Sequence, residues 1–322
     1  DMELELVGFV DDDRQKQGSV IQGVKILGTT DDLPELAAKL EIDHVVITIA
    51  DADAATIRRI VEVCERARLR VRIIPGLYEI LQGQVSISRF RDVQIEDLLG
   101  RKSVRLDEEE LRRFLTGRSV MVTGAGGSIG AELCRQIARF NPLKLLLVER
   151  AEGALFEIHR ELEQLWPELD TVPLVADVGD ETRVRSLLTR HPTQVLLHSA
   201  AHKHVPLMED NPGEAIKNNV LATHRLGRIA GEMELDSFVL ISTDKAVRPS
   251  SIMGASKRLA EQVVLALNRR FPATRFLAVR FGNVMGSTGS VVPIFRQQIE
   301  KGGPVTVTHP EATRFFMTIA EA

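Results

Sequence analysis

Short apolar runs alternate with longer amphipathic stretches along most of the chain. Runs of Val, Ile and Leu, separated by stretches whose apolar residues recur with a helical period, are typical of parallel β-sheets with crossover helices. The pattern occurs twice, before and after a weaker stretch between Gly76 and Gly117. We therefore predict an α/β fold with two doubly wound, parallel-sheet domains.

The first domain is assigned to residues 1–98. An open sheet of this kind begins with a strand and a glycine turn, and none precedes the first apolar run, so we expect that the chain begins inside this domain. The pattern predicts strands at Leu4–Val10, His44–Ile49 and Arg70–Ile74, and helices near Asp32–Leu40 and Ala54–Arg66.

Residues 99–117 are interpreted as a helical connector, in which Asp107 and Glu110 have the spacing of a capping box before one short helix. The second domain is assigned to residues 118–322 and opens with a strand, a glycine-rich turn and a helix. Its further predicted strands are Lys144–Val148, Thr171–Ala176, Gln194–Ser199, Ser237–Ser242 and Arg275–Arg280.

Composition narrows the class of protein. A net charge of −4 and an aromatic content of 4% disfavour binding to a phosphate backbone or to stacked bases, so we expect no nucleic-acid partner. No apolar run approaches the ~18 residues of a membrane span, and the first ten residues lack the basic start of a signal peptide; we expect a cytoplasmic chain. Cys64 and Cys134 fall in helix-like stretches and are predicted core residues.

The glycine-rich turn predicts a dinucleotide site. Its glycines follow a predicted strand and open a helix, so the backbone can approach a pyrophosphate and the first helical N–H groups can bind it. Their spacing is that of short-chain dehydrogenases. The candidate cofactor residues in this turn are Thr123, Gly124, Gly127, Ser128, Ile129 and Gly130.

Charges after the next two strands bear on the choice of cofactor. Glu149 stands where a carboxylate can accept the ribose hydroxyls and repel a 2′-phosphate, which favours NAD over NADP. Arg150 could pair with such a phosphate, so NADP stays open. Asp177 and Val178 are expected beside the adenine, although Asp177 could instead cap the following helix.

Five motifs in order along the second domain carry a family resemblance. They are TGAGGSIG, HSAAHKHVPLMEDNP, KNNVLAT, ISTDKAVRPSSIMGASKRLAE and VRFGNVMGSTGSVVPIF. Together they resemble the membrane-associated bacterial UDP-N-acetylglucosamine 4,6-dehydratases, extended short-chain dehydrogenases that supply nucleotide sugars for capsule, lipopolysaccharide and protein glycosylation. The first domain is similar to the Rossmann-like cytosolic domain that precedes the catalytic domain in these proteins.

This resemblance implies a UDP-N-acetylhexosamine substrate, tightly bound NAD and a sugar-nucleotide lobe that the chain leaves incomplete. It further implies that the full-length protein lies at the cytoplasmic face of the inner membrane, held by N-terminal helices that precede this chain. Homo-oligomers would form through helices that include Met253–Arg270.

The reaction of this family needs an acid and a base. Hydride leaves carbon 4 of the hexose, water is lost from carbons 5 and 6, and hydride returns to carbon 6. The resemblance makes Asp244 the acid and Lys245 the base. Each must hold its less usual protonation state at neutral pH, so we expect both to be buried.

Lys257 follows Met253 by four residues and shares a helix face with it. Short-chain dehydrogenases place Tyr and Lys at this spacing, and the Lys binds the nicotinamide ribose. A thioether cannot carry the proton of a phenol, but the membrane-associated dehydratases characteristically have Met here. Thr243 is our candidate for handling the proton of the carbon 4 hydroxyl.

Further candidates come from the remaining motifs. Lys203 is expected either to meet substrate phosphate or to be solvated, and Asn218 and Asn219 either cap a helix or support the active-site backbone. Arg314 is a weaker uridine-diphosphate candidate. No metal is expected, although His198, His202 and His204 cluster in sequence. The other candidates are Ser199, Ala200 and Ala201 for cofactor and His202, Asn218, Arg280, Asn283 and Val284 for substrate.

Two alternatives stay open. A nucleotide-sugar 4-epimerase would share the hydride transfer at carbon 4 but needs no elimination pair. A non-catalytic NAD-binding scaffold or sensor would fit the methionine at position 253.

Overall fold

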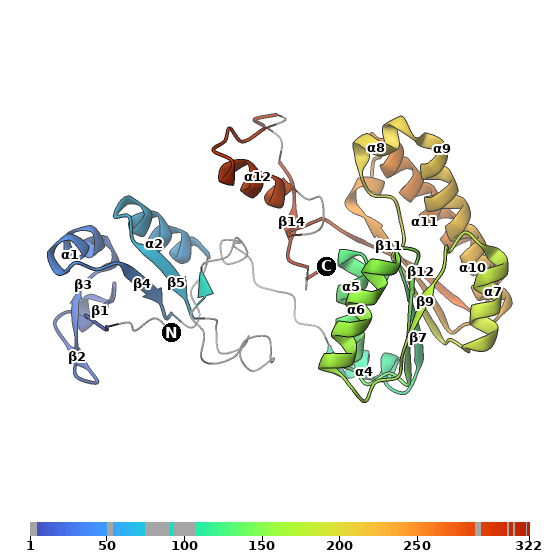
Figure 1. Cartoon of the computed structure of the whole chain (residues 1–322), viewed down its shortest axis with the longest axis horizontal. Coiled ribbons are helices and arrows are strands. Elements are labelled where there is room, and N and C mark those ends of the chain that lie inside the picture. The colour runs from blue at the N-terminus through green and yellow to red at the C-terminus, as the bar shows by residue number, and fades with distance from the viewer. Residues whose placement is uncertain are drawn as a thin grey trace. The chain divides into compact units, whose positions relative to one another are not determined.

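The computed structural model describes residues 5–49, 54–74, 91–92, 107–286, 291–307, 309–311, 313–319 and 321–322. The chain divides into two units, residues 1–103 and 104–322, which are described separately (Figure 1). Among the helices described, none is long and apolar enough to cross a membrane.

Unit 1 contains two three-stranded sheets, and each of them includes one parallel pair of strands. Strand β1 pairs parallel with β3, and β4 pairs parallel with β5, while β2 and β6 add antiparallel edges. The elements are β1 (Phe9–Val10), η1 (Arg14–Lys16), β2 (Val20–Ile21), β3 (Val24–Gly28), η2 (Thr30–Asp32), α1 (Leu33–Leu40), β4 (His44–Ile47), α2 (Ala54–Arg66), β5 (Arg70–Ile73) and β6 (Arg91–Asp92).

The predicted helices and two of the predicted strands of unit 1 are observed within a few residues. The hairpin of β2 and β3 was missed. Its turn residues Gln22 and Gly23 both have positive φ angles, 47° and 84°, as a two-residue hairpin turn of the primed type requires. Leu4 of the first predicted strand lies outside the described residues.

Unit 2 contains a six-stranded, all-parallel sheet in the order β12-β11-β10-β7-β8-β9, which confirms the predicted α/β class. Its elements are α4 (Glu108–Leu115), β7 (Ser119–Thr123), α5 (Ser128–Ala138), β8 (Lys144–Glu149), α6 (Glu152–Leu165), β9 (Thr171–Val175), α7 (Glu181–Arg190), β10 (Val195–His198), α8 (Val205–Asp210), α9 (Pro212–Ala215), the π-helix η4 (Ile216–Ala222), α10 (Thr223–Glu232), β11 (Ser237–Thr243), η5 (Asp244–Ala246), α11 (Ile252–Arg270), β12 (Arg275–Phe281), β13 (Asn283–Val284), α12 (Val291–Glu300) and β14 (Phe316–Met317).

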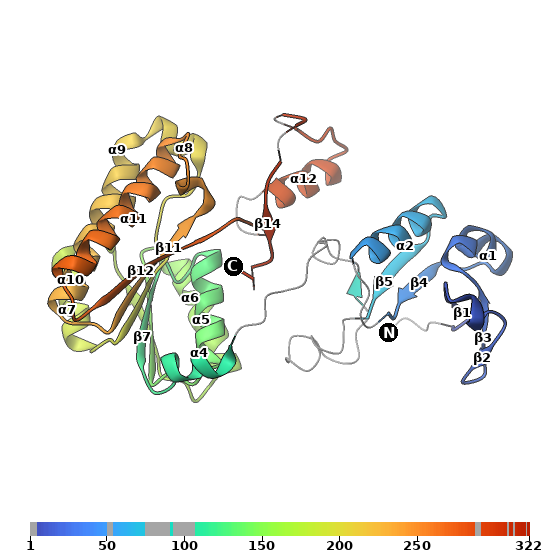
Figure 2. The same ribbon diagram turned by 180° about the vertical axis from the view of Figure 1, so that it is seen from behind.

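Helices cover both faces of this sheet. Helices α5 and α6 lie on one face and α7, α10 and α11 on the other (Figures 1 and 2). Successive residues of a strand point to opposite faces, so Val120 and Val122 pack in one core while Met121 packs in the other. Strands buried on both faces read as continuous apolar runs, which is why the sequence pattern located them.

Helix α4 packs as part of unit 2. The Asp107 carboxylate caps it by accepting hydrogen bonds from the backbone N–H groups of Glu109 and Glu110. Leu115 at its end is 5% exposed and belongs to the core of unit 2. The stretch that we interpreted as a connector therefore ends in a helix that rests on the second sheet.

Both cysteines are buried and free. Burial raises the pKa of Cys64 to about 11 and raises the pKa of Cys134 further, so both thiols stay protonated and inert. The prediction that they are core residues is confirmed.

Candidate functional site

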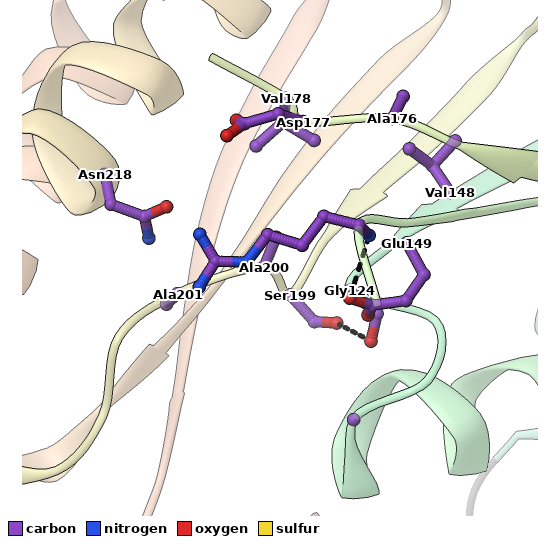
Figure 3. A pocket seen from close by; sticks show the side chains of 12 residues that line it. Gly124, Val148, Glu149, Ala176, Asp177, Val178, Ser199, Ala200, Ala201 and Asn218 are labelled. Carbon is purple, nitrogen blue, oxygen red and sulfur yellow. Dashed lines mark hydrogen bonds between the residues drawn. The ribbon is translucent and has the colours of Figure 1, made fainter. Parts of the chain in front are cut away.

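A cavity of about 170 Å³ opens at the carboxyl ends of the central strands. The strand order changes direction between β7 and β10, and ligands of open α/β sheets bind at this switch point. Figure 3 shows the lining residues at the ends of neighbouring strands. They are Gly124, Gly127, Val148, Glu149, Arg150, Ala176, Asp177, Val178, Ser199, Ala200, Ala201 and Asn218.

The glycine turn forms one wall of the cavity, and its glycines are required for different reasons, a positive φ angle at one and a close backbone contact at another. Gly124 has a φ of +70°, and a Cβ on Gly130 would lie 1.9 Å from the Gly124 carbonyl oxygen. A Cβ on Gly127 would meet nothing nearer than 3.3 Å. The fold itself requires the first and last glycine, whereas a side chain at Gly127 would crowd the Gly124 carbonyl less severely.

The start of α5 faces this turn. Its N-cap residue, Gly127, carries no side chain that could cap the helix. Helix N-termini of this kind bind phosphate groups. Thr123 at the end of β7 and Ser128, Ile129 and Gly130 in the first turn of α5 lie beside the cavity lining without contributing to it.

The Glu149 carboxylate fastens the glycine turn to the end of β8. Its Oε1 accepts from the backbone N–H of Arg150 and Ala151 at 2.9 and 3.0 Å, and its Oε2 accepts from Gly126 at 3.2 Å. A carboxylate offers about four acceptor positions, so one remains for a ribose hydroxyl. Glu149 thus combines a structural role with its predicted place in the cofactor site.

Arg150 and Asp177 are the other charged residues that line the cavity. The Asp177 carboxylate accepts from the backbone N–H of Gly179 at 2.7 Å, while helix α7 is capped by Asp180, so the capping alternative for Asp177 is wrong. Burial lowers the pKa of His202, and the positive charge of Arg150 lowers it further. Arg150, which lines the cavity, therefore lies near enough to His202 in the loop after β10 to act on its charge.

His198 is a fully buried core residue. Its Nδ1 lies 2.7 Å from the Thr123 hydroxyl and its Nε2 lies 2.9 Å from the Thr223 hydroxyl. Burial lowers its pKa to about 3, so the ring is neutral. Both ring nitrogens are occupied by threonines, and within the described parts of the chain no three His, Cys, Asp or Glu residues are grouped to hold a metal.

Asn219, rather than Asn218, supports the loop that follows β10. Its side chain accepts from the backbone N–H of His202 at 2.8 Å, and donates to the His202 carbonyl and to the Ser256 hydroxyl, each at 3.0 Å. Neither asparagine stands at a helix start, since both lie inside η4. Asn218 projects toward the cavity from this helix (Figure 3).

Asp244 and Lys245 lie at the carboxyl end of β11. The Lys245 Nζ is 3.2 Å from the Asp244 Oδ1 and donates to the Asn283 Oδ1 at 2.6 Å. The Thr243 hydroxyl donates to the same Asp244 oxygen at 2.9 Å. The side chains of Asp244 and Lys245 are 42% and 35% exposed, so the expected burial is not provided by the described residues.

Met253 and Lys257 are both buried on one face of α11, at 3% and 6% exposure. Met253 packs against Met208 and Ala215. The Lys257 ammonium donates to the Ile241 carbonyl at 2.7 Å, and burial lowers its pKa to about 8.

The predicted substrate residues after β12 are less uniform. The Arg280 guanidinium forms an ion pair with the buried Glu261 carboxylate and donates two hydrogen bonds to it, at 2.8 and 2.6 Å. Glu261 was missed, although its position four residues after Lys257 on the helix was a usable signal. Val284 is buried in β13. Arg314 and Lys203 are exposed as whole residues. The ammonium group of Lys203 is nevertheless partly desolvated, which lowers its pKa.

Comparisons with known proteins agree with this architecture. Residues 120–322, more than half of the chain, match the family described as "Polysaccharide biosynthesis protein", and residues 1–75 match a CoA-binding domain. The chain is 46% identical over 324 residues to the capsular polysaccharide biosynthesis protein CapD of Staphylococcus aureus, covering 100% of this chain and 54% of that protein. It is 44% identical over 317 residues to the probable polysaccharide biosynthesis protein EpsC of Bacillus subtilis, covering 98% and 53%. The chain thus spans about half the length of these relatives.

Two further proteins are similar to about two thirds of the chain. A UDP-glucose 4-epimerase of Rickettsia prowazekii is 34% identical over 209 residues, which are 64% of this chain and 60% of the epimerase. The X-ray structure of Pen from Bacillus thuringiensis superposes with a TM-score of 0.61 at 31% identity, covering 65% of this chain and 66% of that one. From the matched residues 120–322 and the fold that they form, the chain belongs to the polysaccharide biosynthesis protein family.

Proposed function

We propose that this chain carries the catalytic domain of an NAD-dependent UDP-N-acetylhexosamine 4,6-dehydratase. The observation that carries the proposal is the Asp244–Lys245 pair at the carboxyl end of β11, on the same edge of the sheet as the glycine-lined cavity. A hydride transfer alone needs a cofactor site, whereas an elimination also needs an acid and a base close together.

The cavity suits NAD. The glycine turn and the start of α5, whose N-cap residue Gly127 carries no side chain, suit a pyrophosphate, and Glu149 suits the ribose hydroxyls. Lys257, with a pKa of about 8, would be largely protonated at neutral pH and could donate to the nicotinamide ribose. When bound, NAD would accept a hydride from carbon 4 of the sugar and return it to carbon 6.

The acid and base roles follow from a proton shared by the pair. In the partly exposed pair, Lys245 is the proton donor and Asp244 the acceptor across 3.2 Å. Bound substrate would remove water from both, which favours the neutral forms over the charged ones. Neutral Lys245 then takes the proton from carbon 5, and protonated Asp244 gives its proton to the departing hydroxyl at carbon 6. Water leaves, and the charged pair is restored.

A 4-epimerase is the second candidate, supported by the identity with the Rickettsia enzyme. That reaction requires proton exchange at the carbon 4 hydroxyl. The short-chain dehydrogenase tyrosine that performs it is replaced here by Met253, which is buried among apolar side chains. Oxidation at carbon 4 in a dehydratase needs the same proton exchange, so the absent phenol does not separate the two reactions. The dehydratase proposal is preferred because the chain keeps the Asp244–Lys245 pair, which an elimination needs and an epimerisation does not.

Mass spectrometry of the full-length protein incubated with UDP-N-acetylglucosamine tests the proposal. A dehydratase yields a product lighter by one water, and in deuterated solvent the product acquires deuterium at carbon 5. An unchanged mass with a new stereoisomer would establish the epimerase, and no reaction would support a non-catalytic NAD-binding module.

A further inference from the structure

A buried carboxylate lies beneath the ends of β11 and β12. Glu261 on α11 is 2% exposed. Its Oε1 accepts from the Ser242 hydroxyl at 2.6 Å and from the Arg280 Nε at 2.8 Å. Its Oε2 accepts from the Arg280 Nη2 at 2.6 Å and from the Arg258 Nη1 at 3.2 Å. Burial raises the pKa of Glu261, but the hydrogen bonds from Arg280 and Ser242 outweigh it and the pKa is lowered overall.

These contacts bridge two strands at matching positions. Ser242 and Arg280 are partners in the register of β11 and β12, and Glu261 bonds both. Three residues further along each chain segment, the Lys245 ammonium donates to the Asn283 amide oxygen at 2.6 Å. The second bridge lies beyond the ends of β11 and β12, between η5 and β13, so its geometry depends on how firmly the first bridge holds those strand ends.

The same carboxylate fastens α11 to the sheet. Lys257, one helical turn before Glu261, donates to the carbonyl of Ile241, and Glu261 accepts from the adjacent residue of β11. The charge of Glu261 acts on Lys257 and opposes the effect of burial on its pKa. The other charged groups at this junction are Arg280 and Arg258, both paired with Glu261, and the nearby His198 is neutral.

We infer that Glu261 is the positioning residue of this active site, which holds the Asp244–Lys245 segment and Asn283 in register and keeps Lys257 in place beneath them. The inference rests on the proposed function and extends it by one residue. Stability alone is a poor explanation, since burying an ion pair generally costs as much as it returns. A role in fixing the geometry of the reacting groups explains the buried pair better, because small displacements of such groups lower the reaction rate by large factors.

The decisive variant is Glu261→Gln in the full-length enzyme, with Glu161→Gln as the matched control. Glu161 also forms a two-bond pair with an arginine, Arg135, at 2.6 and 2.9 Å, but it joins α6 to α5. We expect kcat of the Glu261 variant to fall by ~10²-fold, with little change in KM for the nucleotide sugar, and the control to keep its kcat. Equal rates in the two variants would overturn the inference.

A double variant separates positioning from simple neutralisation of Arg280. If Glu261 only balances the guanidinium charge, Glu261→Gln combined with Arg280→Gln removes both charges and restores kcat. If it positions the strand ends, the double variant stays as slow as the single one. Should Glu261→Gln fail to fold, Glu261→Asp keeps the charge and withdraws it by one methylene; an unchanged kcat there would equally refute a positioning role.

Two readouts remain valid even if the protein has no dehydratase activity. Amide hydrogen exchange of the peptide 241–246 should be faster in Glu261→Gln and unchanged in Glu161→Gln. In Glu261→Gln the Lys257 ammonium no longer has the nearby negative charge that raises its pKa. Lys257 should then lose its proton at lower pH, and the loss of NAD affinity at alkaline pH, measured by calorimetry, should move to lower pH with it. If neither changes, Glu261 does not position this segment, whatever reaction the enzyme catalyses.

Discussion

The buried ammonium of Lys257 predicts a specific pH dependence of stability. Its pKa is about 8 in the folded chain, against 10.5 for an ordinary lysine. Between these values the unfolded chain binds more protons than the folded one, so the free energy of unfolding rises with pH across this window. At neutral pH the charge is largely present in both states, and its burial costs ~3 kcal/mol, taking about 1.4 kcal/mol for each pKa unit.

The expected change can be measured as a difference between variants. From about pH 7 to about pH 9.5, relief of this cost should raise the free energy of unfolding by ~2 kcal/mol more in the natural chain than in Lys257→Met, which has no ammonium to titrate. Subtraction of the variant removes the contribution of all other titrating groups. The single tryptophan, Trp166, lies in unit 2, so urea titrations followed by its fluorescence report the unit that contains Lys257.

Lys217→Met is the control, because that ammonium is 70% exposed and pairs only with Glu214 among the described residues. It should show the pH dependence of the natural chain. If Lys257→Met shows the same dependence too, then Lys257 is not a buried ammonium with a lowered pKa, and its proposed role toward the nicotinamide ribose loses its physical basis.

Three further outcomes are expected. Asp244→Asn and Lys245→Met in the full-length enzyme should each lower turnover by the ~10²–10⁴ of a lost general acid or base while nucleotide-sugar binding by calorimetry is kept; a parallel loss of affinity and of the near-ultraviolet signal would mark the pair as structural. Glu149→Ala should weaken NAD more than NADP and also lower the thermal midpoint, since its carboxylate holds the glycine turn; equal losses for both cofactors would contradict a ribose contact. Thr243→Val should slow hydride transfer and enlarge the isotope effect with substrate deuterated at carbon 4, with partial recovery on adding Met253→Tyr; an unchanged isotope effect would remove Thr243 from the mechanism.

Local signals located the sheet and the cavity. The strand runs, the glycine turn and the residues after each strand are encoded within a few consecutive positions, because apolar periodicity and backbone sterics act at that range. Parallel strands then bring their carboxyl ends to one edge. Most of the cavity residues from Gly124 to Ala201 could therefore be named from the sequence, although Val148 and Ala176, which also line the pocket, were not.

Partners across the fold could not be named in this way. Arg280 was expected at the substrate, but the structure pairs it with Glu261 from a different element, and Asn219 rather than Asn218 holds the loop at His202. The degree of burial was also hidden, since Asp244 and Lys245 are partly exposed while Lys257 is enclosed. The sequence by itself determined the α/β fold and the cofactor edge of the sheet, because those follow from short-range patterns. Which charges meet, and how much water reaches them, was decided only by the packing of α11 against β11 and β12, because desolvation and ion pairing depend on neighbours distant in the chain.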